Sequence, residues 1–305
     1  MKKALLFSIT TLLFFTSCET KKDKELAASA SEISKTESIV NATPRVLNKE
    51  FSDYWYAGTA EISSYQLNQS RYGEVRKGTA VTIFVTEDFT PKLQVKADNQ
   101  NNSNIPMLKL NLVKKFNTGV YPYSIMTSTF SPVQNTGHAL KITNSVQEWC
   151  GQTFMQLNNK TKFEIKANSY FESEGDQELS LEKTWIEDEL WNIIRLNPSE
   201  LPMGKFKAIP AFETIRLSHK EIKAFNAVGA LSKEIEQNIY TITYPELKKE
   251  LRITFNNTFP HTINNWEETH ADGNVTTATL LKRIQSPYWN RNSEKFSGLR
   301  DELGL

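Results

Sequence analysis

The sequence is poor in features that would identify its chemistry directly. Its 305 residues hold only two cysteines, Cys18 and Cys150, and their formal net charge is +1. A charge this close to zero gives no electrostatic reason to expect binding to nucleic acid or to an anionic membrane surface. Neither a phosphate-binding glycine loop nor a Gly-x-Ser-x-Gly nucleophile motif occurs. After residue 17, no apolar run approaches the roughly 20 residues that span a bilayer.

The first 17 residues have the pattern of an export signal. Lys2 and Lys3 precede an uncharged, mostly apolar run, which ends Phe-Phe-Thr-Ser directly before Cys18. Two positive charges followed by about a dozen apolar residues are typical of a secretory signal. The small residue before Cys18 resembles the lipobox of bacterial lipoproteins, although Phe15 stands where leucine or valine is usual. We therefore expect residues 1–17 to be a signal peptide and Cys18 to be lipidated; an ordinary signal with an incidental cysteine is the alternative.

Lipidation of Cys18 would anchor the chain to a membrane, because two or more acyl chains hold firmly where one binds marginally. Glu19 follows, instead of the aspartate that retains many Gram-negative lipoproteins at the inner membrane. The expected location is therefore the outer membrane, facing the periplasm or the cell surface. Without Lys2 and Lys3 the net charge becomes −1, and Cys150 is the only free thiol. No disulfide within the chain is then possible, so stability must come from a hydrophobic core.

Composition divides the remaining chain into two parts. Residues 18–46 are polar and low in aromatic residues, which is typical of a flexible tether that cannot bury enough surface to fold. A short helix over 21–37 is the alternative. From residue 47 to 305 we expect a β-rich domain, which aromatic residues at 11% of the chain can supply with a core.

Short runs of β-formers separated by turn residues predict a mainly β fold. An antiparallel meander forming a curved sheet, a half barrel or a sandwich fits this spacing. The candidate strands are 60–67, 79–86, 95–97, 107–113, 123–130, 139–143, 152–157, 162–170, 178–181, 212–217, 223–229, 238–244, 249–255 and 276–285.

One principal helix is expected near 184–196, between two β-rich halves. Thr184 and Glu187 have the spacing of a capping box, and Asn197-Pro198 would end the helix. Apolar residues at helical spacing follow the cap: Ile186, Leu190, Ile193 and Ile194. The segment from residue 72 also echoes the segment from residue 244, so the two halves are either a distant duplication or convergent strand-turn patterns.

Cys150 is one candidate for catalysis. A cysteine nucleophile needs a lowered pKa and a nearby base, and His138 lies twelve residues upstream. The two side chains could meet across a hairpin. The alternative interpretation is that Cys150 is a small buried side chain next to Trp149 in a strand.

Two polar clusters are candidates for metal binding. His261, Glu267 and His270, with neighbouring carboxylates, could bind zinc or a similar ion, although their spacing matches no helical zinc motif. The acidic turn 172–178 around Gly175 could bind calcium. A solvated polar loop or turn is the alternative in both cases, and the sequence predicts no bound cofactor or metal.

Aromatic side chains are frequent on the predicted strands. If the sheet curls without closing, its concave face could hold an apolar or acyl ligand. If the sheet forms a sandwich, the same side chains are core. The partner would then be an envelope protein rather than a small molecule.

Several segments together resemble a family of uncharacterised Gram-negative lipoproteins, many of which carry the label "septum formation inhibitor Maf". The segments are 54–62, 71–74, 85–89, 148–151 and 286–290, and the resemblance covers nearly the whole chain after the signal. True Maf proteins are cytoplasmic nucleotide pyrophosphatases with an N-terminal Ser-x-Arg-Arg motif. The nearest segment here, 27–31, has no arginine. The resemblance therefore implies an exported lipoprotein and not pyrophosphatase chemistry.

Three functions compete. The leading hypothesis is a membrane-anchored envelope lipoprotein that acts as a non-enzymatic binding or envelope-maintenance module, with lipoprotein-carrier half barrels as a fold-level analogy. The second is an envelope hydrolase that uses Cys150 or the carboxylates near His261 and His270. The third, a nucleotide pyrophosphatase, depends on the family label alone.

Overall fold

One large, strongly curved sheet organises residues 43–305, which are the residues that the computed structural model describes. The predicted signal peptide, Cys18 and all but the last four residues of the predicted tether lie outside the described residues. Within the described range, no helix is both long and apolar enough to cross a membrane.

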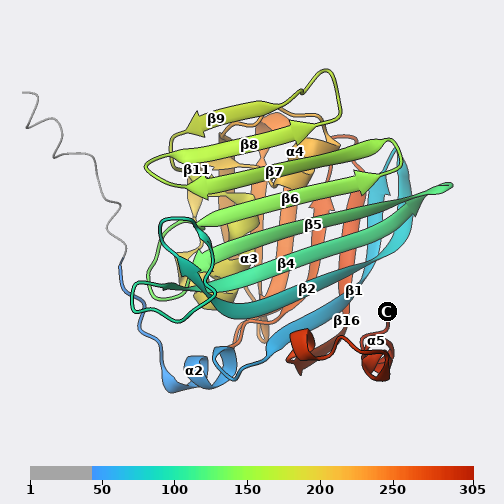
Figure 1. The fold of residues 1–305 in the computed structure, drawn as a ribbon. Coiled ribbons are helices and arrows are strands. Elements are labelled where there is room, and N and C mark those ends of the chain that lie inside the picture. Colours follow the sequence, from blue (N-terminus) through green and yellow to red (C-terminus); the bar gives the residue numbers. More distant parts are fainter. Residues whose placement is uncertain (1–42) are drawn as a thin grey trace, which may run out of the picture. The chain divides into compact units, whose positions relative to one another are not determined.

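Sixteen strands of the described chain make up the sheet (Figure 1), and they are antiparallel except where β10 meets β11. The strand order is β10-β11-β12-β13-β14-β15-β16-β1-β2-β4-β5-β6-β7-β8-β9, with β3 beside β2. The strands are β1 (Ala60–Arg71), β2 (Glu74–Thr90), β3 (Val95–Lys96), β4 (Ile105–Thr118), β5 (Tyr121–Pro132), β6 (Lys141–Glu148), β7 (Gly151–Asn159), β8 (Phe163–Ser169), β9 (Gln177–Leu181), β10 (Trp185–Ile186), β11 (Gly204–Ile209), β12 (Phe225–Lys233), β13 (Gln237–Tyr244), β14 (Lys249–Asn256), β15 (Ile263–Thr269) and β16 (Val275–Ser286). The predicted mainly β fold with a curved antiparallel meander is confirmed.

The curvature brings the two ends of the sheet around a pair of helices. Strands β4–β9 cross in front of the upright strands β11–β16, and the helices lie between them (Figure 1). The sheet consists of two meanders, β1–β9 and β10–β16, which the pairing of β1 with β16 joins. A bulge between Ser64 and Tyr65 interrupts this pairing. Such bulges bend a strand and increase its twist. Whether the two meanders arose by duplication stays a prediction.

Helices fill the concave side and cover one edge. The described helices are α2 (Lys49–Trp55), α3 (Glu187–Leu196), α4 (Phe212–Leu217) and α5 (Gly298–Glu302), with single 3-10 turns at Pro198–Glu200, Pro245–Leu247, Tyr288–Asn290 and Glu294–Phe296. All ten residues of α3 are buried. The C-terminal segment covers the outer face of β1, where Ser64 donates a hydrogen bond to the carbonyl of Leu303.

An ion pair between α3 and β1 is enclosed in this core. The Arg195 guanidinium binds the Glu61 carboxylate through two bonds of 2.5 and 2.7 Å. It also lies over the rings of Trp55 and Phe84. Arginine stacks on aromatic rings and binds carboxylates through two parallel bonds, so it can be buried where lysine would be less well satisfied.

The principal helix is confirmed, but its start differs from the prediction. Thr184 does not cap it and instead donates its hydroxyl to the carbonyl of Lys207. Trp185 and Ile186 form β10, and the Glu189 carboxylate accepts the backbone N–H of Ile186 at 3.1 Å. The helix therefore begins at Glu187, once the chain has left the sheet.

Two other predictions of secondary structure are wrong. The predicted strand 212–217 is the helix α4, and the Asp188 carboxylate accepts the N–H of Phe212 at its first turn. A distant side chain thus supplies the cap that the local sequence lacks. The polar stretch 261–272, expected to be a loop, contains β15, whose Trp266 is buried in the core.

The folded unit also begins earlier than residue 47. Thr43 donates its backbone N–H to the hydroxyl of Thr136. The Arg45 guanidinium pairs with Glu200 at 2.6 Å and donates to the carbonyl of Asn135 at 2.7 Å. Thr43 and Arg45, which lie in the segment expected to be a tether, thus contact the β-rich domain.

Candidate functional site

One end of the curved sheet is open and charged, and we call it the mouth. It comprises the turns of the hairpins β1–β2, β4–β5, β6–β7 and β8–β9, the turns β13–β14 and β15–β16, and the C-terminal end of α4. It lies at the right-hand end of strands β4–β7 in Figure 1. A pocket of about 330 Å³ opens there and is lined by Gln69, Ser70, Arg71, Tyr72, Glu213, Thr214, Leu217, Ser218, Lys220, Leu247, Lys249, Glu268, His270, Ala271 and Asp272.

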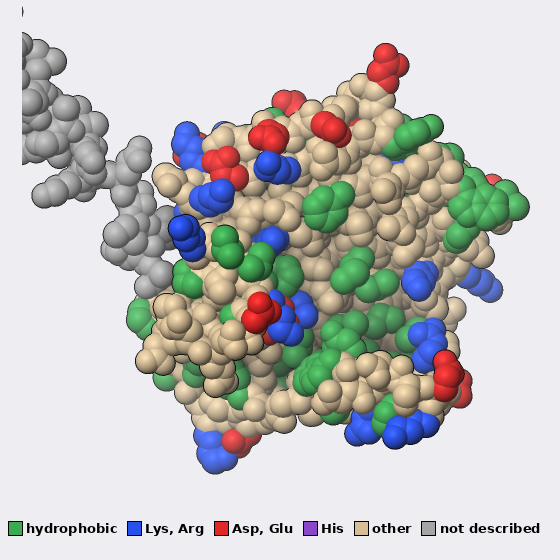
Figure 2. Space-filling view, in the orientation of Figure 1, with side chains coloured by type: hydrophobic (Ala, Val, Ile, Leu, Met, Phe, Trp, Pro, Cys, Tyr) green, Lys and Arg blue, Asp and Glu red, His purple; other side chains and the backbone are tan. Residues whose placement is uncertain are grey.

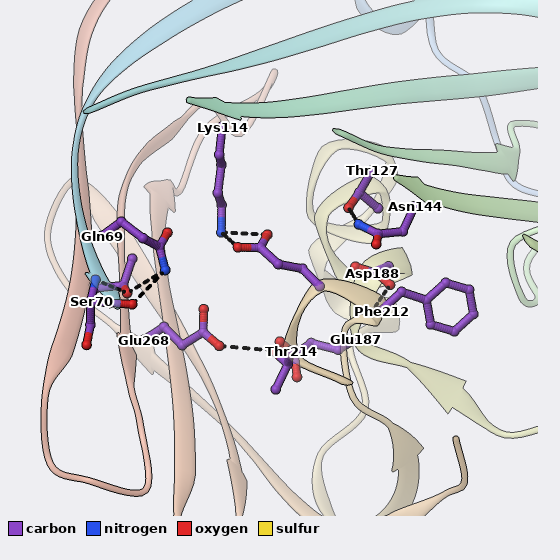
Figure 3. Close-up of polar contacts among 12 residues, drawn as sticks. Gln69, Ser70, Lys114, Thr127, Asn144, Glu187, Asp188, Phe212, Thr214 and Glu268 are labelled. Carbon is purple, nitrogen blue, oxygen red and sulfur yellow. Dashed lines mark hydrogen bonds and ion pairs between the residues drawn. The ribbon is translucent and has the colours of Figure 1, made fainter. Parts of the chain in front are cut away.

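The floor of the pocket is a network of buried charges. Lys249 of β14 lies between two carboxylates, at 2.5 Å from Glu187 and 3.3 Å from Glu268. Lys114 of β4 binds Glu213 of α4 at 2.9 Å. Strands from both meanders and both inner helices therefore meet at this floor, and in Figure 3 Lys114 extends from its strand toward α4.

The charges of the floor hold one another in the ionised form. Burial would raise the pKa of Glu268, but Lys249, His270 and Lys114 lower it to about 2. Burial disfavours the charge on Lys249 as well, and its two carboxylate partners outweigh that effect and raise its pKa. The hydroxyl of Thr214 donates a further hydrogen bond to Glu268 at 3.1 Å (Figure 3). The floor is thus a fixed set of full charges in an environment of low dielectric constant.

A small void lies behind the floor. It measures about 20 Å³ and shares Glu213, Thr214 and Glu268 with the pocket. This volume suffices for one water molecule, with several polar partners around it. Asp188 lines the void, and burial raises the pKa of its carboxyl to about 7, although the N–H of Phe212 lowers it in part.

The lip of the pocket is made of aromatic and cationic side chains. Arg71 lies 4.2 Å from the ring centre of Tyr72 and donates to the carbonyl of Leu217 at 2.7 Å. The hydroxyls of Tyr72 and Tyr123 are 2.8 Å apart. Figure 2 shows hydrophobic side chains standing out at the same right-hand edge, where Trp149 is among the exposed aromatic residues.

The structure does not bring Cys150 and His138 together. Cys150 is exposed in the turn after β6, so its interpretation as a small buried side chain is also wrong. His138 lies before the start of β6, where Glu189 binds it at 2.8 Å. Eight residues of strand separate the two, which corresponds to roughly 26 Å. A hydrogen bond with Glu148 raises the pKa of the Cys150 thiol, which opposes a role as nucleophile.

The candidate metal ligands His261 and His270 are likewise separated, at the two ends of β15. His261 lies at one end, 3.2 Å from the carbonyl of Asn256. His270 lies at the other end, 2.8 Å from the hydroxyl of Thr276. Glu267 is exposed on the outer face. Among the described residues, no group of three or more His, Cys, Asp or Glu side chains is arranged to hold a metal ion.

The acidic turn after β8 binds other protein groups. The Glu174 carboxylate lies 2.6 Å from Nδ1 of His219, and it accepts a hydrogen bond of 2.5 Å from the Ser169 hydroxyl. Asp176 accepts the backbone N–H of Ser169 at 3.2 Å. These contacts use the oxygens that a calcium ion would need.

The residues that form the floor were not among the site residues predicted from the sequence. Glu268, next to the candidate Glu267, points inward because neighbouring residues of a strand face opposite sides. Lys114 lies two residues from both Leu112 and Phe116, which face inward, so the same rule places it on the inner face. A third member, Glu213, had no such signal because its segment was assigned to a strand.

Comparison with known proteins shows a similarity at the level of the fold. No protein-family model matches the chain, and no curated protein matches it. The chain resembles the crystal structure of a beta-barrel-like protein of domain of unknown function DUF1849 from Brucella abortus, with 11% identity and a TM-score of 0.46. The match covers 74% of this chain and 98% of that one.

Proposed function

We propose that the chain is a membrane-anchored, non-enzymatic binding module of the bacterial envelope, and that its ligand binds in the mouth pocket. The observation that supports this most directly is the pocket itself. It is open to solvent, and its floor is a network of buried, paired charges. Fixed charges and a concave shape are the usual components of a specific site for a small molecule. Because Glu187, Glu213 and Glu268 are all engaged by lysines, the floor suits recognition better than proton transfer.

The shape of the core favours a polar ligand over an acyl one. A half barrel that carries an acyl chain needs an empty apolar groove along its concave face. Here α3 occupies that face, with Trp191 and Trp266 in edge-to-face contact at 5.1 Å. The mouth pocket, in contrast, is lined by charged and hydroxyl-bearing side chains. We therefore propose a compact polar ligand in place of the apolar ligand that the sequence suggested.

The anchor belongs to the same proposal. A signal peptide over residues 1–17, lipidation of Cys18 and an outer-membrane location rest on the sequence alone. The described chain begins at Thr43, beside Thr136, which follows the end of β5 that is distant from the mouth.

Native mass spectrometry of the full chain, purified gently from bacterial envelopes, tests the proposal. Ala271→Trp places a large side chain in the pocket wall, and Ile235→Trp is the matched control because Ile235 is 96% exposed in the turn between β12 and β13. We expect an added mass on the wild type and on Ile235→Trp that is lost on Ala271→Trp, with similar melting temperatures for all three proteins. An added mass that survives in Ala271→Trp, or a wild type without any bound molecule, would contradict the proposal.

A further inference from the structure

One wall of the mouth pocket carries Arg71 and Lys220, and Arg216 belongs to the adjoining last turn of α4 without lining the pocket itself. Arg216 is 1% exposed, yet its Nε and Nη1 atoms have no hydrogen-bond partner among the described residues. Its nearest carboxylate oxygen, on Glu148, is 3.9 Å away, which is too far for a hydrogen bond. Arg71 also has an unpaired buried Nε. Within the described chain, neither Arg71 nor Lys220 forms an ion pair. We call Arg71, Arg216 and Lys220 the cationic wall.

These charges are close enough to repel one another. Burial lowers the pKa of Arg216, and the charge of Arg71 lowers it further, although carboxylates including Glu174 act in the opposite direction. Phe171 covers one face of the Arg216 guanidinium, with 4.2 Å between its central carbon and the ring centre. A buried guanidinium without a hydrogen-bonded counterion is costly. An anion bound beside Arg71 would offset the repulsion between the two guanidinium groups.

The wall is continuous with the pocket. Arg71, Ser218 and Lys220 line it directly, whereas Arg216 does not. Arg71 is held in place by the carbonyl of Leu217, the residue that follows Arg216. The three cations therefore gather at the C-terminal end of α4, since Arg216 is in its last turn, Arg71 binds its last carbonyl and Lys220 follows it in sequence. The carboxylates of the pocket lie on the floor and in the turn between β15 and β16.

A buried acceptor lies next to this wall. Gln69 lines the pocket and is 1% exposed. Its amide nitrogen donates to Thr276 at 3.1 Å, while its Oε1 has no partner among the described residues. A buried acceptor without a partner calls for an N–H or O–H donor. The site thus requires an anion and a donor a short distance apart.

We propose that the ligand of the mouth pocket is a small hydroxylated or amino-bearing acid whose carboxylate or phosphate binds the cationic wall, while a neighbouring O–H or N–H group donates to Gln69. This inference rests on the proposed binding function and specifies the chemistry of its ligand. Arginine recognises both oxyanions through its planar set of donors.

Isothermal titration calorimetry on the purified full chain tests the inference. The probes are glucuronate for a hydroxylated carboxylate, inorganic phosphate for the other oxyanion, and glucose as the uncharged counterpart of glucuronate. We expect saturable binding of glucuronate or phosphate within about 10 mM, and weaker or no binding of glucose. The stronger of the two anions identifies the acidic group.

Variants connect the binding to the wall. Arg71→Gln and Lys220→Gln, the second at an exposed position, should each weaken anion binding about tenfold or more, since charge-assisted hydrogen bonds are lost. Lys205→Gln, on an exposed position of β11, is the control and should bind like the wild type. Arg71→Lys keeps the charge and should recover part of the loss. Melting temperatures verify that each variant is folded.

Failure of this inference can be distinguished from failure of the binding function. Equal binding of glucose and glucuronate, anion binding unaffected in both Arg71→Gln and Lys220→Gln, or no saturable anion binding would overturn it. A neutral molecule that co-purifies with the wild type and is lost on Ala271→Trp would also overturn it, while the mouth pocket would still be a binding site.

Discussion

Replacing Lys249 by methionine is the sharpest test of the charge network in the floor of the pocket. Methionine keeps most of the side-chain length and removes the cation. In the wild type, the ammonium group lies 2.5 Å from Glu187 and 3.3 Å from Glu268, and its side chain is only 3% exposed. The variant therefore leaves two buried carboxylates with only the more distant cations of the cluster.

The magnitude follows from this burial. Removing one partner of a buried ion pair typically costs about 3–5 kcal/mol, because an uncompensated charge remains. Lys249 is the largest of the three cations that lower the Glu268 pKa from 4.5 to about 2, and the whole of that lowering corresponds to roughly 3 kcal/mol at neutral pH. We expect Lys249→Met to lower the free energy of unfolding by about 3–5 kcal/mol at pH 7, and Lys249→Met with Glu187→Gln to recover part of this loss.

The loss of stability in Lys249→Met should depend on pH, in a direction that follows from the Glu268 pKa. Since the Glu268 pKa is lowered on folding, its contribution to stability is present above about pH 4.5 and disappears as the pH falls toward 2. Without Lys249 the buried carboxylates regain protons at higher pH, so the deficit of the variant should shrink from pH 7 to pH 4. Urea unfolding followed by tryptophan fluorescence at these two pH values measures it, with Lys205→Met as an exposed control. A deficit below about 1 kcal/mol at pH 7, or one that is equal at both pH values, would refute the reasoning.

Two further substitutions test other parts of the structure. Asp188→Asn should stabilise the protein at pH 8 but not at pH 4, because the raised pKa of about 7 makes wild-type stability fall between roughly pH 4 and 7, while asparagine can still accept the N–H of Phe212; urea midpoints at both pH values measure this. Gly229→Ala should lower stability by about 1–3 kcal/mol, since its Cβ would overlap the carbonyl of Pro202, whereas Gly298→Ala, with no atom within 4 Å, should change it little; a thermal melt compares the two.

The strands were predictable because their inward and outward residues alternate along long segments. In β4, Leu110, Leu112 and Phe116 face the core, and this regularity identifies the strand without tertiary information. The segment 212–217 could not be assigned in the same way. Its helix depends on Asp188, a side chain 24 residues away in sequence, and local propensity does not report such a cap.

The candidate site was predictable only in part, for a related reason. Histidines, cysteines and carboxylates that are close along the chain indicated Cys150, His261 and His270 as candidates. In an antiparallel meander, residues close in sequence but separated by a strand lie at opposite ends of the sheet. The floor instead joins Lys114 and Lys249, which meet only because the sheet curves until β4 and β14 face each other.

A comparison of the two buried charge systems supports the choice of the mouth as the site. Arg195 and Glu61 are enclosed by aromatic rings, satisfy each other through two bonds and border no large pocket. Their arrangement is what a purely structural pair requires, because every donor that can be satisfied locally is satisfied. Arg216 is buried to the same extent, but its Nε and Nη1 have no hydrogen-bond partner among the described residues, and its neighbours Arg71 and Lys220 line an open pocket. Since a buried polar group without a partner destabilises the fold, the unpartnered Oε1 of Gln69 and Nε of Arg71, both on residues that line the pocket, support the proposed anion site at the mouth.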